Sequence, residues 1–118
     1  MRYILLIYGH EADAAKMTEA EGAAIMQAYY TYTQALTTAG VIVSGEPLQS
    51  VTTATTVRVR NGKRATTDGP FAETKEQLGG FYVLNCKNLD EAIEWAAQCP
   101  GAKDGSMEVR PIMELPGM

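Results

Sequence analysis

The stretch from Asp68 to Glu76 (Asp-Gly-Pro-Phe-Ala-Glu-Thr-Lys-Glu) gathers side chains that could do acid–base chemistry into one short motif segment. The glycine and proline that follow Asp68 predict a turn, because glycine accepts positive φ and proline fixes φ at about −65°. A carboxylate of Asp68 or Glu73, partly removed from water beside the ring of Phe71, would bind a proton more readily and could act as a general base. In the alternative, structural interpretation, Asp68 caps the turn through its own backbone while Phe71 fills the core.

The single histidine, His10, is by residue type the best general acid–base candidate, because imidazole changes its charge near neutral pH. Without an evident partner in the sequence, it could equally be an exposed loop side chain with no role. One histidine beside Glu11 and Asp13 lacks the defined spacing of a metal site, and Cys86 and Cys99 form no ligand pattern. We therefore expect no metal and no cofactor.

Three charged residues, Glu46, Glu108 and Arg110, stand on or beside predicted strands among apolar neighbours, where a charge usually needs a partner. A salt link from Glu108 or Glu46 to Arg110 is the simpler interpretation. The alternative is that Arg110, with Glu46 nearby, binds the carboxylate of an anionic substrate.

A basic patch surrounds the dipeptide Asn61-Gly62 and comprises Arg58, Arg60, Lys63 and Arg64. Such a patch could hold an anionic substrate or an acidic partner. Lysine and arginine also commonly protect the edge of a hairpin from strand addition, and we interpret the patch in this way.

Length and composition bound the class of protein. A chain of 118 residues predicts one domain, covering residues 1–118, that buries about two-thirds of its unfolded surface. The net charge of −4 argues against direct binding of nucleic acid. The apolar run from Tyr3 to Tyr8 is too short for a signal peptide or a membrane span. We expect a cytoplasmic protein with reduced thiols.

The elements that must position these residues follow from the hydrophobic pattern and from turn signals. We predict strands at 2–8, 41–44, 55–60, 63–67, 81–86 and 107–113, and helices at 18–39 and 88–99. The connection from His10 to Met17 is polar and alanine-rich. Asn61-Gly62 predicts a type I′ hairpin turn, Gly79-Gly80 a bulge or close backbone approach, and Pro111 an edge position for the last strand.

Both helices carry a capping signal and an apolar stripe. Thr18 with Glu21 has the form of a capping box, and Asn88 stands three residues before Glu91. The predicted inner stripe of the first helix is Gly22, Ile25, Tyr29, Tyr32, Leu36 and Ala39, and that of the second is Leu89, Ala92, Ile93 and Ala96, flanked by Trp95.

The order β-α-β, inserted hairpin, β-α-β predicts an α+β fold of the ferredoxin-like βαββαβ type, an antiparallel sheet with two helices on one face. The two strands that are central in this topology, 2–8 and 81–86, are apolar on both sides. A second copy of the same sheet is the simplest cover for the open face, so we expect a homodimer with sheet facing sheet.

Segments along nearly the whole chain resemble the YCII-related family, in the subgroup named after its Asp-Gly-Pro-Phe motif. The matching segments are Tyr3–Tyr8, Gly45–Leu48, Ala54–Arg58, Asp68–Glu76, Gly79–Phe81, Glu94–Ala96 and Glu108–Pro111. The resemblance implies a dimeric α/β barrel built on the ferredoxin-like plan, which agrees with the strands that are apolar on both sides.

The resemblance also bears on activity. Some YCII relatives are similar to lactone dehydrohalogenases that use a His–Asp pair with the histidine on the first helix. The helix predicted at 18–39 holds no histidine, and Tyr29 or Tyr32 stands at that sort of position. Members of the subgroup are also similar to proteins found beside, or fused to, alternative sigma factors.

Two hypotheses follow. In the first, the chain is a cofactor-free homodimeric enzyme of the proton-transfer lyase or isomerase type, acting on a small organic substrate bound between the sheet and the motif segment. The candidate catalytic residues are Asp68, His10 and Glu73, and the candidate substrate-binding residues are Phe71, Arg110, Glu46 and Tyr29. In the second, it is a non-catalytic module that binds a ligand or works with a sigma factor. Neither hypothesis involves direct contact with nucleic acid or a membrane.

Overall fold

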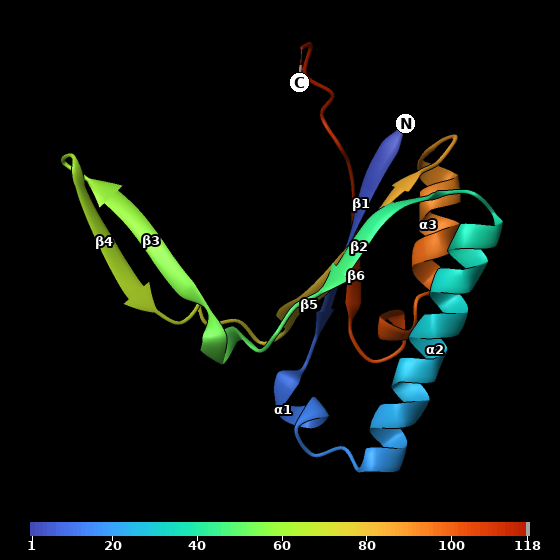
Figure 1. Cartoon of the computed structure of the whole chain (residues 1–118), viewed down its shortest axis with the longest axis horizontal. Helices are drawn as coiled ribbons and strands as arrows, with labels where there is room; N and C mark the ends of the chain where they lie inside the picture. The colour runs from blue at the N-terminus through green and yellow to red at the C-terminus, as the bar shows by residue number, and fades with distance from the viewer. Residues whose placement is uncertain (118) are drawn as a thin grey trace.

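The structure, a computed structural model, describes residues 1–117 and has two layers, a sheet and a pair of helices (Figure 1). The strands are β1 (Arg2–Gly9), β2 (Ile42–Pro47), β3 (Thr55–Arg60), β4 (Lys63–Asp68), β5 (Gln77–Asn85) and β6 (Ser106–Pro111). The helices are α1 (Glu11–Ala14), α2 (Glu19–Thr38) and α3 (Leu89–Gln98), with short 3-10 turns η1 (Val51–Thr53) and η2 (Pro100–Ala102).

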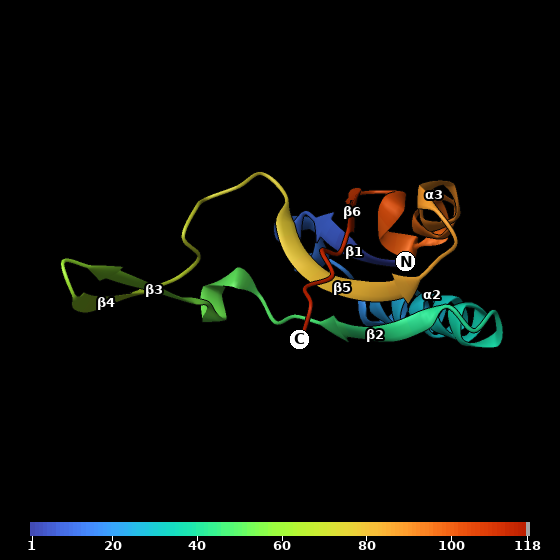
Figure 2. The same ribbon diagram turned by 90° about the horizontal axis from the view of Figure 1, so that it is seen from above.

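The main sheet has the strand order β2-β5-β1-β6, and every neighbouring pair is antiparallel. Helices α2 and α3 lie on one face of this sheet, as Figure 2 shows from above. The ferredoxin-like α+β prediction is therefore confirmed, with β1 and β5 in the centre. The last strand, β6, pairs only with β1, which gives Pro111 the edge position expected of a residue without an N–H donor.

The predicted helix caps are present. The Thr18 hydroxyl accepts the backbone N–H of Glu21 at 3.1 Å, and the Glu21 carboxylate accepts the N–H of Thr18 at 3.1 Å, which completes a capping box. The Asn88 side chain accepts the N–H of Glu91 at 2.9 Å and so begins α3. The local sequence alone thus correctly predicts which residues accept hydrogen bonds from, or donate them at, the first turns of α2 and α3.

The core lies between the sheet and the helices, and its largest fully buried side chains are Leu5, Leu36, Leu84 and Cys99. The prediction that Leu89 and Ile93 of α3 belong to the core is wrong, because they are 46% and 48% exposed. The alanines of α3, Ala92 and Ala96, are buried as expected, and the space beside them is filled by Tyr32, Trp95 and Cys99. Because alanine side chains are small, the helix lies close to its neighbours along this face, and the larger residues at the margin of the face remain exposed to solvent.

The inner stripe of α2 is also shorter than predicted. Tyr32 and Leu36 are buried, but Ile25 is 38% exposed and Gly22 is exposed. The second half of α2 packs on the sheet, whereas its first half borders a groove described below. The apolar residues of α2 therefore lie on two different surfaces: some pack in the core, and others line the groove.

The other face of the sheet is apolar and has no covering element among residues 1–117. The register places Ile4, Leu6, Phe81 and Val83 on this open face. Glu108 and Arg110, opposite Leu6 and Ile4, also lie on it, and they form the predicted ion pair with each other. The side chains of Ile4, Leu6 and Phe81 are half-buried by their neighbours within the sheet.

A bulge interrupts β5 at the predicted glycine pair. Ile7 pairs with Gly80, but the next residue of β1, Tyr8, pairs with Leu78, so Gly79 is an extra residue in the strand. A Cβ atom on Gly80 would lie 3.0 Å from the carbonyl oxygen of Glu46, which is the close backbone approach expected there. The strand begins at Gln77 instead of residue 81, because pairing continues through the bulge.

Two further boundaries differ from prediction. The connection after His10 contains a short helix, α1, because its alanine-rich residues favour helix once the chain turns. Strand β2 extends to Pro47, beyond the predicted end at Ser44, because Gly45 and Glu46 still pair with β5.

Strands β3 and β4 form a separate hairpin, which we call the arm (Thr55–Asp68). Asn61 and Gly62 both have positive φ, at 53° and 73°, as the predicted type I′ turn requires. The arm leaves the sheet on the side opposite to α2 and α3 (Figures 1 and 2). No helix among the described residues is long and apolar enough to cross a membrane.

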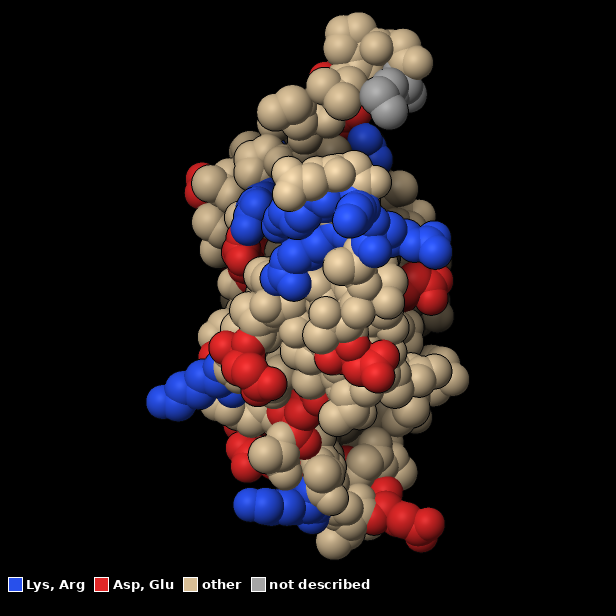
Figure 3. All heavy atoms as spheres, turned by 90° about the vertical axis from the view of Figure 1, so that its left-hand side faces the viewer, with Lys and Arg blue, Asp and Glu red and all other residues tan. Residues whose placement is uncertain are grey.

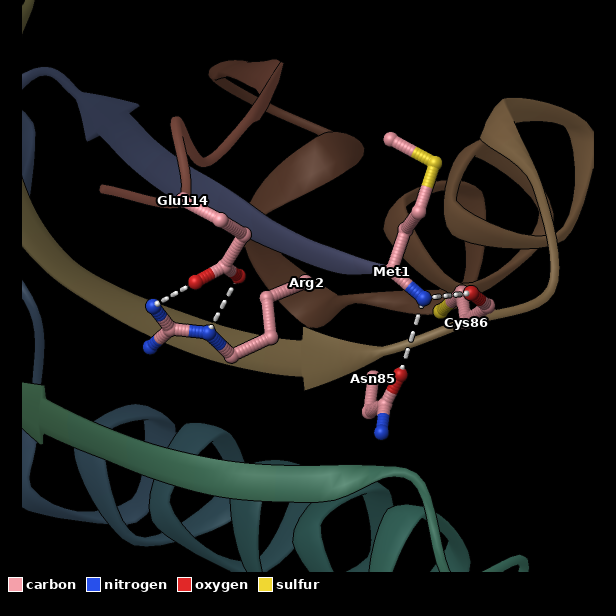
Figure 4. A network of polar contacts seen from close by, with 5 residues as sticks. All are labelled: Met1, Arg2, Asn85, Cys86 and Glu114. Atoms are coloured by element: carbon pink, nitrogen blue, oxygen red, sulfur yellow. Dashed lines mark hydrogen bonds and ion pairs between the residues drawn. The ribbon is translucent and has the colours of Figure 1, made fainter. Parts of the chain in front are cut away.

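Polar contacts fix the start of β1 and the segment that follows β6 (Figure 4). The ammonium group of Met1 donates to the Asn85 side chain at 3.1 Å and to the Cys86 carbonyl at 3.0 Å. The guanidinium of Arg2 donates twice to the carboxylate of Glu114, at 2.8 and 2.9 Å. The pairing with Arg2 lowers the pKa of Glu114 and holds the segment after β6 beside β1.

Candidate functional site

A groove with a volume of about 1020 Å³ opens on the helix side of the sheet, where β1 ends. Its walls come from the end of β1, from α1, from the first half of α2, from β2 and β5, and from the segment around η2. This volume is at the upper end of the roughly 300–1,000 Å³ typical of small-molecule sites. A smaller hollow of about 500 Å³ lies at the other end of β1, beside Met1 and Trp95.

Glycines keep the wall of the groove free of side chains. A Cβ atom on Gly45 would lie 2.6 Å from the ring of Tyr82, and one on Gly101 would lie 2.8 Å from the hydroxyl of Tyr29. The Tyr82 hydroxyl is 2.7 Å from the Thr33 hydroxyl, so this ring is held against α2. The aromatic side of the groove is thus fixed before any ligand enters.

His10 lies on the wall of the groove at the N-cap of α1. Its backbone carbonyl accepts hydrogen bonds from the N–H groups of Asp13 and Ala14, at 3.1 and 3.2 Å. The backbone of His10 is therefore fixed at the start of α1, whereas these bonds do not involve its imidazole ring. The side chain is half-buried and forms no hydrogen bond within residues 1–117. An imidazole of this kind is available to a ligand.

A polar network that the sequence did not reveal fixes α1 at the groove. The Glu11 carboxylate accepts hydrogen bonds from the Ser50 hydroxyl at 2.8 Å and from the backbone N–H of Val51 at 3.1 Å. The Gln77 side chain accepts the N–H of Glu11 at 3.0 Å and donates to the carbonyl of Thr74 at 2.6 Å. The end of the motif segment, α1 and η1 are therefore held together around the position of His10.

The phenols beside the groove are kept protonated. Burial raises the pKa of Tyr29 well above its ordinary value, and the neighbouring Cys99 thiol adds to this effect. Burial likewise raises the pKa of Tyr32 and of Tyr82. At neutral pH, Tyr29 can therefore donate a hydrogen bond to a ligand but cannot act as a base.

The structure brings three of the seven candidate site residues to the groove and places four elsewhere. His10, Tyr29 and Glu46 line it. Asp68 is the exposed last residue of β4, and Glu73 is also exposed. The expectation that Phe71 fills the core is wrong, because its side chain is 79% exposed. A motif segment that follows a protruding arm has no surrounding core in its own chain.

The match to known sequences extends along the whole of this architecture. Residues 1–116 match the family model described as the YCII-related domain. The chain belongs to the YCII-related family. An uncharacterized protein of Rhizobium meliloti (strain 1021) is similar to this YCII-related protein, with 37% identity over 114 residues, which cover 95% of this chain and 92% of the relative.

In this YCII-related protein, Arg110 is not part of the groove. It pairs with Glu108 on the open face of the sheet, and its side chain is 67% exposed. The hydrogen bond and charge of Glu108 raise the pKa of Arg110. Of the two links predicted from sequence, the pair with Glu108 is therefore confirmed, and Glu46 forms no salt bridge within residues 1–117.

The charges around the groove of this YCII-related protein are all negative. The lining includes Glu11, Asp13, Glu46 and Asp104, and it includes no lysine or arginine among the described residues. Across residues 1–117, no three His, Cys, Asp or Glu side chains gather closely enough to hold a metal ion. The groove accordingly offers apolar contact, one imidazole and neutral phenols, and it would repel an anion.

Proposed function

We propose that the groove binds a small, largely apolar organic molecule and that His10 transfers a proton within it, as in a cofactor-free lyase or isomerase. The observation that supports this proposal is the position of an imidazole, without a hydrogen-bond partner among residues 1–117, on the wall of an apolar groove of about 1020 Å³. Imidazole exchanges protons readily at neutral pH, which general acid–base catalysis requires.

The neighbouring groups suggest how the step would proceed. Neutral His10 takes a proton from a C–H group next to a carbonyl, and the bonding electrons move into the enolate. The protonated phenol of Tyr29 donates a hydrogen bond to the developing oxyanion. In an isomerase the substrate carries a C=C bond conjugated to the enolate, and His10 returns the proton to the far carbon of this dienolate. In a lyase the enolate expels a leaving group from the next carbon, a C=C bond forms there, and His10 gives the proton to the leaving group. Neither step needs a cofactor.

Asp68 and Glu73 remain candidate catalytic groups only if they come from another subunit, since both lie outside the groove of their own chain. The apolar open face supports such an assembly. Ile4, Leu6 and Phe81 of one copy would pack on the same residues of another, as in a two-fold symmetric dimer. Sedimentation as a monomer at micromolar concentration would contradict this dimer.

The proton transfer can be tested without knowing the natural substrate. A panel of small ketones, lactones and 2-oxo esters is incubated with the protein in D₂O, and deuterium uptake at carbon next to the carbonyl is followed by NMR. We expect His10→Gln to abolish any uptake that the native protein catalyses and Tyr29→Phe to slow it about 10²-fold. Asp90→Asn, a change of the same size on the exposed side of α3, is the matched control. Equal uptake in His10→Gln and native protein would exclude the role of His10.

The second candidate function, a non-catalytic module that works with a sigma factor, draws on a different observation. Val57, Val59 and Phe71 expose 58%, 61% and 79% of their surface on the arm and the motif segment, which is unusual for a surface without a partner. Titration of the purified protein with a sigma factor encoded beside its gene would test it. Submicromolar binding that is lost in Phe71→Ser would favour this function over catalysis.

A further inference from the structure

Within residues 1–117, no other element packs against the arm beyond its base. Strands β3 and β4 pair only with each other, and nearly all of their residues are exposed. At the base, the N–H of Gly69 donates to the Ala54 carbonyl at 2.7 Å, and the Thr56 hydroxyl donates to the Gly69 carbonyl at 2.8 Å. An isolated two-stranded hairpin is marginally stable in water, so an arm of this length is expected to rest on another surface.

The exposed area of the chain exceeds what a compact monomer needs. The described chain has an accessible surface of 8633 Å², whereas a monomer of 12.8 kDa is expected to expose about 6,300 Å². The radius of gyration, 16.4 Å, compares with about 13.5 Å for a compact domain of this length. The excess of roughly 2,300 Å² is larger than the ~800 Å² that each partner gives to a standard interface. The chain can therefore bury both the open face and the arm in one assembly.

The two faces of the arm differ in character. Because side chains alternate along a strand, Arg58, Arg60 and Lys63 lie on one face, and Val57 and Val59 lie on the other. Seen from the side on which the arm projects, basic side chains form a band over an otherwise mixed surface (Figure 3). The arm thus presents a row of cations together with apolar area.

The helices carry the opposite charge. Helices α2 and α3, which form the helix layer, contain five carboxylates and no lysine or arginine between their first and last residues: Glu19, Glu21, Asp90, Glu91 and Glu94. The arm of the same chain cannot meet these carboxylates, because it projects from the opposite side of the sheet (Figure 1). The basic arm and the acidic helix layer can therefore meet between two copies of the chain, although they cannot meet within one.

We propose that, in the dimer, the arm of each copy lies along the helix layer of its partner and sets its basic face against the partner's carboxylates. The inference rests on the sheet-to-sheet dimer of the proposed function. In that dimer the arm extends from the open face past the partner's sheet, toward the layer that holds its helices. Two-fold symmetry makes the contact reciprocal, so each subunit both gives and receives an arm.

Zero-length carbodiimide crosslinking of a mixture of ¹⁴N- and ¹⁵N-labelled protein tests the contact directly. Lys63 carries the only amine of the arm. We expect mixed-isotope peptides that join Lys63 to a carboxylate of α2 or α3. A dimer in sedimentation whose Lys63 forms no mixed-isotope crosslink would overturn the arm contact and leave the dimer standing. A protein that sediments as a monomer would overturn both.

A charge reversal measures the contribution of the contact. The triple variant Arg58→Glu, Arg60→Glu, Lys63→Glu should raise the dimer dissociation constant at least about tenfold at low salt. The control reverses three lysines outside the arm, Lys16, Lys87 and Lys103, which are all exposed, so the net charge changes by the same amount. The gap between the two variants should narrow above about 0.5 M salt, where exposed charges are screened. Equal dissociation constants for the two variants at low salt would refute the proposal.

Discussion

A single methyl group at Gly105, the residue before β6, should push the start of β6 away from β1, next to the groove that Gly105 and Tyr8 both line. A Cβ atom at this position would lie 2.0 Å from the carbonyl oxygen of Tyr8, 3.0 Å from its carbonyl carbon and 3.1 Å from the Cα of Gly9. All three atoms belong to the backbone of β1, so no change of side-chain rotamer can relieve the overlap. In Gly105→Ala, the start of β6 must move away from β1.

The loss of stability in Gly105→Ala can be estimated from the interactions made by the start of β6. Inserting a methyl group into a packed site costs about 1–3 kcal/mol, and we expect the upper end because backbone must move. The pairing of Ser106 with Tyr8 weakens, as do the hydrogen bonds that Ser106 donates to the Glu76 carboxylate, at 2.9 and 3.0 Å. For a chain of 118 residues the unfolding entropy is about 250 cal/mol/K, so 3 kcal/mol lowers Tm by about 12 °C.

Thermal unfolding followed by circular dichroism gives this shift, and hydrogen exchange over residues 69–76 reports the release of the motif segment. Gly9→Ala is the matched control: it lies on the adjacent strand, and a Cβ atom there meets nothing within 4 Å. We expect it to raise the free energy of unfolding by up to about 1 kcal/mol. A Tm for Gly105→Ala within about 2 °C of the native value, or equal shifts for both variants, would refute the reasoning.

Three further predictions concern the core, the thiols and the arm. Tyr32→Phe removes a buried hydroxyl that donates a hydrogen bond to the Trp95 carbonyl at 2.7 Å, so it should lower the free energy of unfolding in urea by about 1–2 kcal/mol. Tyr30→Phe, at a side chain that is 68% exposed, should lower it by less than about 0.5 kcal/mol. Burial raises the pKa of the Cys86 and Cys99 thiols above the unfolded value of 9.0, so the unfolded chain loses these protons first. The urea midpoint should therefore hold steady up to about pH 8 and fall as the pH rises through 9 and beyond, and a level midpoint to about pH 10.5 would contradict it. Gly62→Ala forces a side chain to φ +73° and should cost about 1 kcal/mol, seen as faster hydrogen exchange in β4 without a change in the exchange of β1.

Much of the fold could be predicted because its signals are local. The capping residues Thr18 and Asn88 and the turn residues Asn61 and Gly62 each determine the backbone within a few positions of themselves. The exposure of Leu89 could not be predicted in this way, because burial depends on how far neighbouring elements extend over a helix face. Helical spacing shows which residues share a face, but it does not show where the packed surface ends.

The candidate site was harder to predict from sequence because its parts meet only in three dimensions. Residue type indicates His10, and the resemblance to dehydrohalogenases indicates the position of Tyr29, but only the fold shows that both lie at one groove. The link between Glu11 and Gln77 spans 66 positions and has no local signal. The motif segment is the most conspicuous part of the sequence, yet the side chain of Phe71 is largely exposed among the described residues. The sequence alone does not show whether an exposed aromatic residue of this kind contacts another subunit.

The bulge at Gly79 determines which changes of chain length this part of β5 can accommodate. The extra residue reverses which face the preceding residues occupy, so Gln77 falls on the side of Ile7 and Gly9 and reaches the backbone of Glu11. A side chain at Gly79 would have only the Ile7 carbonyl oxygen nearby, at 3.8 Å, so substitution there is sterically cheap. Deletion of Gly79 would remove the bulge, and a regular ladder would still set Leu78 opposite Tyr8 and Gln77 opposite Gly9, so both side chains would keep their faces. Insertion of a second residue beside Gly79 would instead require a larger bulge or would turn Gln77 toward the open face, away from the backbone of Glu11, so it should be more damaging than the deletion.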